Sequence, residues 1–324
     1  MSARARQRGV ALLVALLVVA LATILVAALL DRGELGAART RNLLRGEQAE
    51  AYAQGLELYA EQVLLLAAQQ GGPDTNASPW ALPLPPQPVP GGVIGATMRD
   101  RNGCFNLNNL LPVSEGGNPP VWRPVFEHLL DALGVDSALA TDVVAWLDPA
   151  PSANDNSYLA QAVPYRPAHR AFAHVSELRL VRGVGGEVYA RLAPHVCALP
   201  PGTTINVNTA SVPVLQALLG PGVSAAVAQN LWQNGAAHWQ GVGDDFQNAL
   251  ARLQVPVPAG LTTLASVKST WFLARGDIVL DGVPFTFFSL IDGRTLSVVE
   301  RSRGADDVLA GPALPASGSD GSVP

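Results

Sequence analysis

The distribution of apolar and polar positions divides the chain into an apolar beginning, a helical middle and an end with period-two alternation. From Val10 to Leu30 the chain carries no charged residue, and Thr23 is the one hydroxyl in that run. At about 1.5 Å rise per residue the run is about 31 Å long as a helix, which matches the hydrocarbon core of a bilayer. A single segment is stable in lipid only as a helix, because its backbone groups must bond within the segment. We therefore predict a membrane-spanning helix over residues 10–31.

The charges around this run predict its orientation. Arg4, Arg6 and Arg8 precede it, and Asp31 and Glu34 follow it. This asymmetry favours a cytoplasmic N-terminus with the remainder of the chain exported. A secretory signal peptide would need a shorter apolar region followed by a small-residue cleavage site, and neither feature is present. A plain signal anchor stays open as an interpretation.

Beyond the apolar run, apolar residues recur at spacings of three and four among charged ones, as at Leu56, Tyr59, Val63 and Leu66. This pattern predicts an amphipathic continuation of the helix over residues 32–70. Residues 71–92 are dense in proline and glycine, and we predict a loop there without regular structure.

Residues 93–100 read as a strand, 101–103 as an Asn-Gly turn and 104–108 as a returning strand. The sequence Phe-Asn-Leu-Asn-Asn at 105–109 is echoed by Ile-Asn-Val-Asn-Thr at 205–209. Both segments end in side chains suited to capping a following helix.

Helical patterns dominate from about residue 112 to residue 262. Helices are predicted over residues 123–133 and 136–147, and a helix, Gly-x-Gly turn, helix pattern occurs after Ser176 and again over residues 214–232. After Leu261 the pattern alternates with period two. Asp-Gly turns at 281–282 and 292–293 separate three apolar strands, which predicts an antiparallel meander.

Strands before and after a long helical block indicate an α+β fold, in which a helical domain is inserted into a small antiparallel sheet. The predicted organisation is a leader at 1–9, a transmembrane helix at 10–31, its amphipathic continuation at 32–70, a loop at 71–92, strands at 93–111, the inserted helical domain at 112–263, strands completing the sheet at 264–303 and a disordered tail at 304–324.

Charge and cysteine content constrain the function. The formal net charge is −5, and it becomes −8 without the three leader arginines, so the exported part is a poor match for nucleic-acid phosphates. Cys104 and Cys197 are the two cysteines. An oxidising compartment favours a disulfide between them, and two separate buried thiols are the alternative.

One polar loop offers oxygen ligands that suit a hard cation such as calcium. Asp148, Asn154, Asp155 and Asn156 lie within nine residues of one another, with Ser152 among them. The competing interpretation is a turn whose side chains bond their own backbone, and the low number of carboxylates favours it.

The Gly-x-Gly turns resemble helix-hairpin-helix motifs, in which amides at a helix N-terminus face a DNA phosphate. Residues 205–235 contain no lysine or arginine, which argues against that use. The chain has no P-loop, GxSxG or HExxH motif, and nothing in it nominates a catalytic residue. We therefore predict no enzyme, although a membrane-anchored hydrolase stays as an alternative.

The basic leader ending at Gly9, directly before the apolar run, resembles the class III leader of type IV pilins and pseudopilins. The resemblance implies peptidase cleavage after Gly9 and N-methylation of Val10. Most of these proteins carry a glutamate at the fifth mature position, where this chain has Val14. An intramembrane carboxylate needs a partner, so a subunit without one needs no preceding subunit. This departure, with the helical insertion and the paired asparagine segments, resembles the K minor pseudopilins of type II secretion.

Several expectations follow from that resemblance. It implies a single-pass inner-membrane protein with a periplasmic C-terminal part, located at the pseudopilus tip. Its partners would be the I and J minor pseudopilins, the major pseudopilin, the inner-membrane secretion platform and prepilin peptidase, with secreted cargo or the secretin contacting the helical domain. Some members are expected to bind calcium, and no nucleic acid is expected. A membrane-anchored helix-hairpin-helix protein for DNA binding or uptake is the alternative function.

Overall fold

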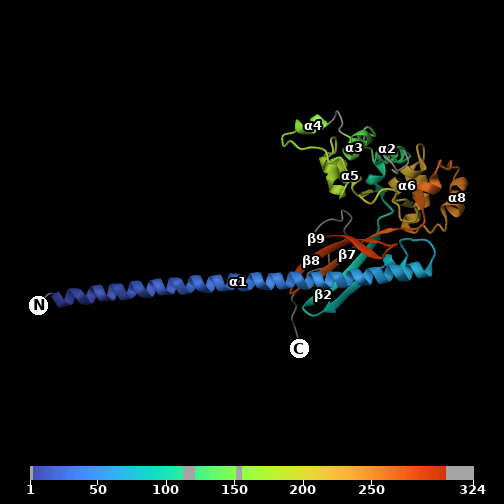
Figure 1. Cartoon of the computed structure of the whole chain (residues 1–324). Helices are drawn as coiled ribbons and strands as arrows, with labels where there is room; N and C mark the ends of the chain where they lie inside the picture. Colours follow the sequence, from blue (N-terminus) through green and yellow to red (C-terminus); the bar gives the residue numbers. More distant parts are fainter. Residues whose placement is uncertain (1–2, 112–120, 151–154, 304–324) are drawn as a thin grey trace. The chain divides into compact units, whose positions relative to one another are not determined.

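The computed structural model describes residues 3–111, 121–150 and 155–303 (Figure 1). Contacts within the chain divide it into two units, Met1–Tyr52 and Ala53–Pro324. One helix, α1 (Ala3–Gln70), contributes to both units. The predicted tail at 304–324 lies outside the described residues.

The first unit consists of the N-terminal part of α1. Its side chains from Val10 to Leu30 are exposed, although they are apolar. The most apolar window of this helix has a mean hydropathy of 3.1, and the helix is long enough to cross a membrane. Exposed apolar surface of this extent is stable in lipid rather than in water, which is consistent with a single-pass anchor.

The second unit contains a five-stranded antiparallel sheet in the order β1-β2-β7-β8-β9. The strands are β1 (Leu84–Val89), β2 (Gly92–Asp100), β7 (Trp271–Leu280), β8 (Val283–Asp292) and β9 (Ser297–Arg303). The predicted turn at Asp281-Gly282 joins β7 to β8, and the turn after Asp292 joins β8 to β9. The meander is confirmed, although the first of its strands begins at Trp271, later than the predicted start of the strand region at residue 264.

Strand β1 contradicts the prediction that residues 71–92 hold no regular structure. It contains Pro85, Pro86 and Pro88, yet it pairs with β2 in an irregular register. Proline is tolerated there because β1 is an edge strand, and only one of its two sides needs to form ladder bonds. A short 3₁₀ helix, η1 (Pro79–Ala81), also lies within the predicted loop.

The C-terminal part of α1 packs on this sheet. Leu56, Ala60 and Leu64 are buried, and Ala60 and Leu64 belong to a cluster with Phe272 and Ile291 of the sheet. Gly276 of β7 leaves room for the helix, since a Cβ atom there would lie 3.0 Å from Leu56 Cδ1.

An ion pair between a buried carboxylate and an exposed arginine adds to this apolar packing. Glu57 of α1 is 5% exposed and accepts a 2.5 Å hydrogen bond from the hydroxyl of Ser289. Arg301 of β9 donates to both carboxylate oxygens of Glu57, at 2.7 and 2.6 Å. A two-pronged contact of this kind fixes orientation as well as position. These bonds therefore fix the position of α1 along the sheet.

The helical insertion leaves the sheet after β2 and returns to it before β7. Its elements are η2 (Leu107–Leu110), α2 (Trp122–Ala132), α3 (Leu139–Leu147), α4 (Asp155–Leu159), η3 (Val175–Leu180), α5 (Gly186–Leu192), α6 (Val212–Leu219), α7 (Ala225–Trp232), η4 (Gln233–Gly235), η5 (Val242–Phe246), α8 (Gln247–Arg252) and α9 (Leu261–Leu264). They enclose one apolar core around Phe105, Phe126 and Leu215.

Two short parallel strand pairs frame the insertion. Strand β3 (Phe105–Asn106) pairs with β4 (Val196–Cys197), and β5 (Ile205–Asn206) pairs with β6 (Ala265–Ser266). The predicted hairpin over residues 93–108 is therefore wrong. Strand β2 pairs with β7 instead, because the Asn-Gly segment carries the chain out of the sheet rather than back along it.

Candidate functional site

The residues predicted for processing lie near the start of α1. Gly9 and Val10 are within the helix, and Val14 is an exposed apolar side chain on its surface. The fifth position after Gly9 is therefore part of a lipid-compatible surface that holds no carboxylate. Cleavage after Gly9 and methylation of Val10 stay predictions.

The part of α1 that packs on the sheet also has an unusual outer face. Gly55, Leu58, Gln62 and Leu66 recur at spacings of three and four, and all are exposed. Leu58 is 62% exposed and Leu66 is 49% exposed. A helix that buries a single face normally carries charged residues on the opposite one. We call these four residues the outer stripe, and none of them carries a charge.

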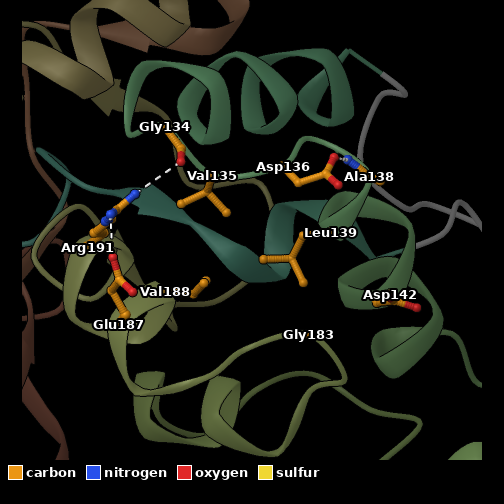
Figure 2. A pocket seen from close by; sticks show the side chains of 10 residues that line it. All are labelled: Gly134, Val135, Asp136, Ala138, Leu139, Asp142, Gly183, Glu187, Val188 and Arg191. Carbon is orange, nitrogen blue, oxygen red and sulfur yellow. Dashed lines mark hydrogen bonds and ion pairs between the residues drawn. The ribbon is translucent and has the colours of Figure 1, made fainter.

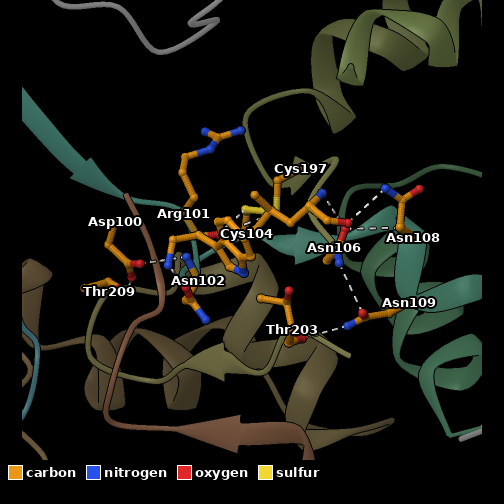
Figure 3. Close-up of a disulfide and its surroundings, with 12 residues drawn as sticks. Asp100, Arg101, Asn102, Cys104, Asn106, Asn108, Asn109, Cys197, Thr203 and Thr209 are labelled. Carbon is orange, nitrogen blue, oxygen red and sulfur yellow. Dashed lines mark hydrogen bonds between the residues drawn. A yellow bond between two sulfur atoms is a disulfide. The ribbon is translucent and has the colours of Figure 1, made fainter. Parts of the chain in front are cut away.

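The disulfide lies where the helical insertion begins (Figure 3). Cys104 and Cys197 are bonded to each other, with their Cα atoms 5.9 Å apart. Cys197 is fully buried, and it belongs to the strand β4 that pairs with β3. The bond therefore closes the 93-residue separation that contains the first half of the insertion.

The first asparagine segment holds the ends of that half together. Asn106 caps η2 by accepting a hydrogen bond from the Asn108 amide, so the cap comes from the start of the segment and not from its end as the sequence suggested. Its side chain also bonds Leu199 N and Pro200 O. Asn108 is buried, and it donates to Phe172 O and accepts from Phe172 N. These long-range bonds go beyond the local caps that the sequence indicated.

The second segment uses the same geometry in a different place. Asn206 accepts from the Asn208 amide, and Asn208 donates to Trp239 O and accepts from Trp239 N. Asn206 also donates to the backbone oxygen of Asp74. This last bond ties the insertion to the segment that follows α1.

The predicted cation loop is only partly described, because Asn154 lies outside the described residues. Asp148 accepts a hydrogen bond from the Ala150 amide, and the Asp155 carboxylate lies 3.1 Å from His169 Nε2. Among the described residues no group of three or more His, Cys, Asp or Glu side chains is arranged to hold a metal ion. Asp148 and Asp155 are thus engaged in contacts within the protein, while Asn156 is exposed. Calcium binding by this loop therefore stays a prediction.

A pocket of about 360 Å³ lies beside the first Gly-x-Gly turn (Figure 2). Asp136, Asp142 and Glu187 line it. Arg191, which also lines it, donates hydrogen bonds to the Glu187 carboxylate and to the carbonyl oxygen of Gly134. Carboxylates around the turn repel phosphate. The surroundings of this turn therefore disfavour the helix-hairpin-helix use in DNA binding.

No motif in the sequence marked the junction between the sheet and the insertion. Asn102 is almost fully buried there, and its side chain accepts from the amides of Thr270 and Trp271 and donates to Thr204 O. Its Asn-Gly sequence suggested a hairpin tip. The available signal was the polar Asp-Arg-Asn sequence directly after an apolar strand.

Comparison with known proteins gives a consistent result. The family model described as type II secretion system (T2SS), protein K, matches residues 103–201. The type II secretion system protein K of Pectobacterium carotovorum is 33% identical, and the match covers 93% of this chain and 98% of that protein. The protein K of Pseudomonas aeruginosa is 38% identical over 77% of this chain and 79% of its own length.

A solved structure is also similar over most of the chain. The crystal structure of the GspK-GspI-GspJ complex from the type 2 secretion system of enterotoxigenic Escherichia coli contains a chain that matches with a TM-score of 0.70 and 30% identity. The match covers 82% of this chain and 99% of that chain. The similarity therefore includes the sheet and the helical insertion together.

Proposed function

Since the chain belongs to the type II secretion system protein K family, we propose that it acts as a minor pseudopilin at the tip of the pseudopilus. In this role it assembles with the I and J minor pseudopilins above the major pseudopilin and supports export of folded proteins across the outer membrane. The N-terminal part of α1 holds it in the inner membrane, where the secretion platform draws it into the assembly.

The outer stripe of α1 is the observation that carries this proposal. Gly55 presents no side chain, and no atom lies within 4 Å of the place where its Cβ would be. Leu58 and Leu66 follow Gly55 along the same stripe, both on its C-terminal side. A glycine next to exposed leucines on one helix face admits the ridge of a second helix. The helix of another pseudopilin is therefore the expected occupant.

Val14 supports a terminal position in the assembly. A buried carboxylate in this segment would need a cationic partner from a neighbouring subunit. Because the position is apolar, the chain does not require a subunit ahead of it. The helical insertion would then face the secretin or secreted cargo.

The contact is tested by replacing Leu58 with arginine in the full-length chain, expressed with the I and J pseudopilins. A buried unpaired charge disfavours helix packing, so Leu58→Arg should reduce co-purification of both partners by at least about tenfold and abolish secretion. Leu180→Arg is the matched control, because Leu180 is a 45% exposed leucine in the helical insertion. Equal complex formation by both variants would contradict the proposal.

Processing at Gly9 is tested separately on protein extracted from membranes. We expect the chain to begin at Val10 and to carry one additional methyl group, and Gly9→Val should leave the leader attached. An intact Met1 in the wild-type protein would mean a plain signal anchor. Such a result would remove the route into a pseudopilus.

A further inference from the structure

The helical insertion carries one exposed loop without any charged residue. The loop covers residues 159–164, with the sequence Leu-Ala-Gln-Ala-Val-Pro, and all of these residues are exposed. Leu159 is 42% exposed and Val163 is 78% exposed. A run of exposed apolar residues is unfavourable in water and marks an interaction surface when it persists in a folded protein. We call residues 159–164 the apolar loop.

Two tyrosines hold the ends of the apolar loop together. The ring centroids of Tyr158 and Tyr165 lie 5.5 Å apart, and the Tyr165 amide donates a hydrogen bond to Tyr158 O. Both rings also pack on Trp146, with centroid distances of 5.5 and 6.4 Å. Tyr158 and Trp146 belong to the apolar core of the insertion, and Tyr165 packs against that core. The residues between the two tyrosines are therefore held outside the core.

Two arginines lie beside this aromatic base. The Tyr165 hydroxyl donates a 2.8 Å hydrogen bond to Leu180 O, which brings the end of η3 next to the loop. Arg166 directly follows Tyr165, and Arg179 directly precedes Leu180. Both arginines are exposed. The apolar loop is thus bordered by two positive charges that come from different elements.

These two charges are not neutralised within the part of the chain that the structure describes. No carboxylate there pairs with Arg166 or Arg179, whereas the neighbouring Arg182 pairs with Asp142. Arg179 lies over the ring of Tyr189, 5.4 Å from its centroid. Residues 155–182 contain four arginines and two carboxylates, a net charge of +2 in a chain whose net charge is −5. The surroundings of the apolar loop therefore attract anions.

We propose that the apolar loop, Arg166 and Arg179 form a docking surface for an anionic phospholipid bilayer. Leu159 and Val163 enter the boundary between headgroups and acyl chains, and the two guanidinium groups contact lipid phosphates. Apolar side chains bordered by arginines are the combination that binds such an interface. Because α1 anchors the chain in a membrane, a lipid surface is present wherever the chain is inserted.

The shape of the loop favours lipid over a protein as the occupant. Val163 projects from the surface, so a protein partner would need a cavity of matching shape to bury it. A bilayer adapts to a projecting apolar side chain without a preformed cavity. The positive border then selects anionic over zwitterionic headgroups, since each arginine near the surface favours an anionic membrane about fivefold.

Co-sedimentation with vesicles tests this surface on the full-length chain. The chain is first placed in phosphatidylcholine nanodiscs, so that its membrane helix is already occupied and cannot enter the vesicles. Large vesicles of phosphatidylcholine alone, or of equal parts phosphatidylcholine and phosphatidylglycerol, are then added and sedimented. Binding to the phosphatidylglycerol vesicles should be at least about tenfold stronger, and empty nanodiscs should stay in the supernatant.

Variants of the surface separate its apolar and charged contributions. Val163→Asp should weaken binding at least about tenfold, because the carboxylate resists burial and is repelled by the anionic lipid. Arg166→Ala should weaken it about fivefold. Val257→Asp is the matched control and should bind as the wild type does, because Val257 is a 46% exposed valine in the insertion outside the loop.

Two results would overturn the proposal. One is a wild-type chain that stays in the supernatant with both kinds of vesicle, as expected if this surface binds a protein instead. The other is an equal loss of binding in Val163→Asp and Val257→Asp. The assay contains no other pseudopilin, so either result would leave the proposed role in secretion intact.

Discussion

The two asparagine segments of the insertion share a local geometry and differ in what they hold. In both, the first asparagine accepts a bond from the amide two residues on, and the next asparagine pairs with one distant backbone residue. The first segment, at 105–109, lies directly after the disulfide residue Cys104, and its partners Phe172, Leu199 and Pro200 all belong to the insertion. The second, at 205–209, bonds to Asp74 and Asp100, outside the insertion.

This difference separates local structure from attachment. In both segments the Asn-x-Asn sequence turns the chain directly after a two-residue strand, into the 3₁₀ helix η2 in the first and into a turn in the second. What surrounds the turn then decides its role, since one copy stabilises a half of the insertion and the other connects the insertion to the sheet. The comparison predicts that the two copies respond differently to substitution.

The largest expected effect comes from removing the disulfide, which lies beside the first asparagine segment and has no counterpart beside the second. The double variant Cys104→Ala, Cys197→Ala should lower the free energy of unfolding by about 4 kcal/mol, because the bond restricts a long loop in the unfolded chain. Denaturant titration followed by tryptophan fluorescence measures this change. A loss below about 1 kcal/mol would mean that the disulfide contributes little to the first half.

Replacing the buried asparagine of the first segment should cost more stability than replacing that of the second. Asn108→Leu leaves Phe172 N, Phe172 O and Leu199 O without their partner, so we expect a loss of about 3 kcal/mol. Asn208→Leu leaves the backbone N–H and C=O groups of Trp239 without this partner, so we expect the free energy of unfolding to fall by about 2 kcal/mol. The same titration compares the two variants, and a larger loss for Asn208→Leu would reverse the ranking.

The smallest effect concerns a surface ion pair that exists in the first half. Arg182 lies 2.5 Å from Asp142, but the Arg182 side chain is 42% exposed. Asp142→Asn should therefore cost about 0.5 kcal/mol at low salt and less at high salt. Thermal unfolding at two salt concentrations provides the measurement. A loss as large as that of Asn108→Leu would show that surface charge, rather than buried amides, holds this half together.

The strand meander was predictable because its signals are local. Asp281-Gly282 lies between two apolar runs, and a two-residue turn of that type determines both pairing and register. The helices of the insertion were predictable for a similar reason, although Val175–Leu180 forms a 3₁₀ helix in place of the predicted α-helix. Short-range patterns were therefore sufficient for elements that find their partners nearby.

Two features could not be predicted because their causes lie far away in the sequence. Strand β1 forms despite its prolines because β2 offers it an edge position, which no local pattern specifies. Asn102 looks like a hairpin tip, yet its partners are Thr270 and Trp271. The contact of the Asp155 carboxylate with His169, fourteen residues further along the chain, was likewise not visible in a local pattern.

The candidate site divides in the same way. The apolar run, Gly9 and Val14 were identifiable from the sequence because lipid and a leader act on consecutive residues. The outer stripe required the structure, since Leu58 and Leu66 are distinguished from the buried Leu56 and Leu64 only once the sheet is in place. The exposed and buried leucines of α1 were therefore told apart by the structure and not by the sequence periodicity.

Site-specific photo-crosslinking from position 58 in intact cells tests the central claim most directly. A crosslinker in place of Leu58 should yield adducts with another minor pseudopilin, whereas the same group in place of Leu180 should yield none with that protein. Adducts from position 58 would establish the outer stripe as a pseudopilin contact. Absence of pseudopilin adducts from position 58, in cells that secrete normally, would contradict assembly through this face of α1.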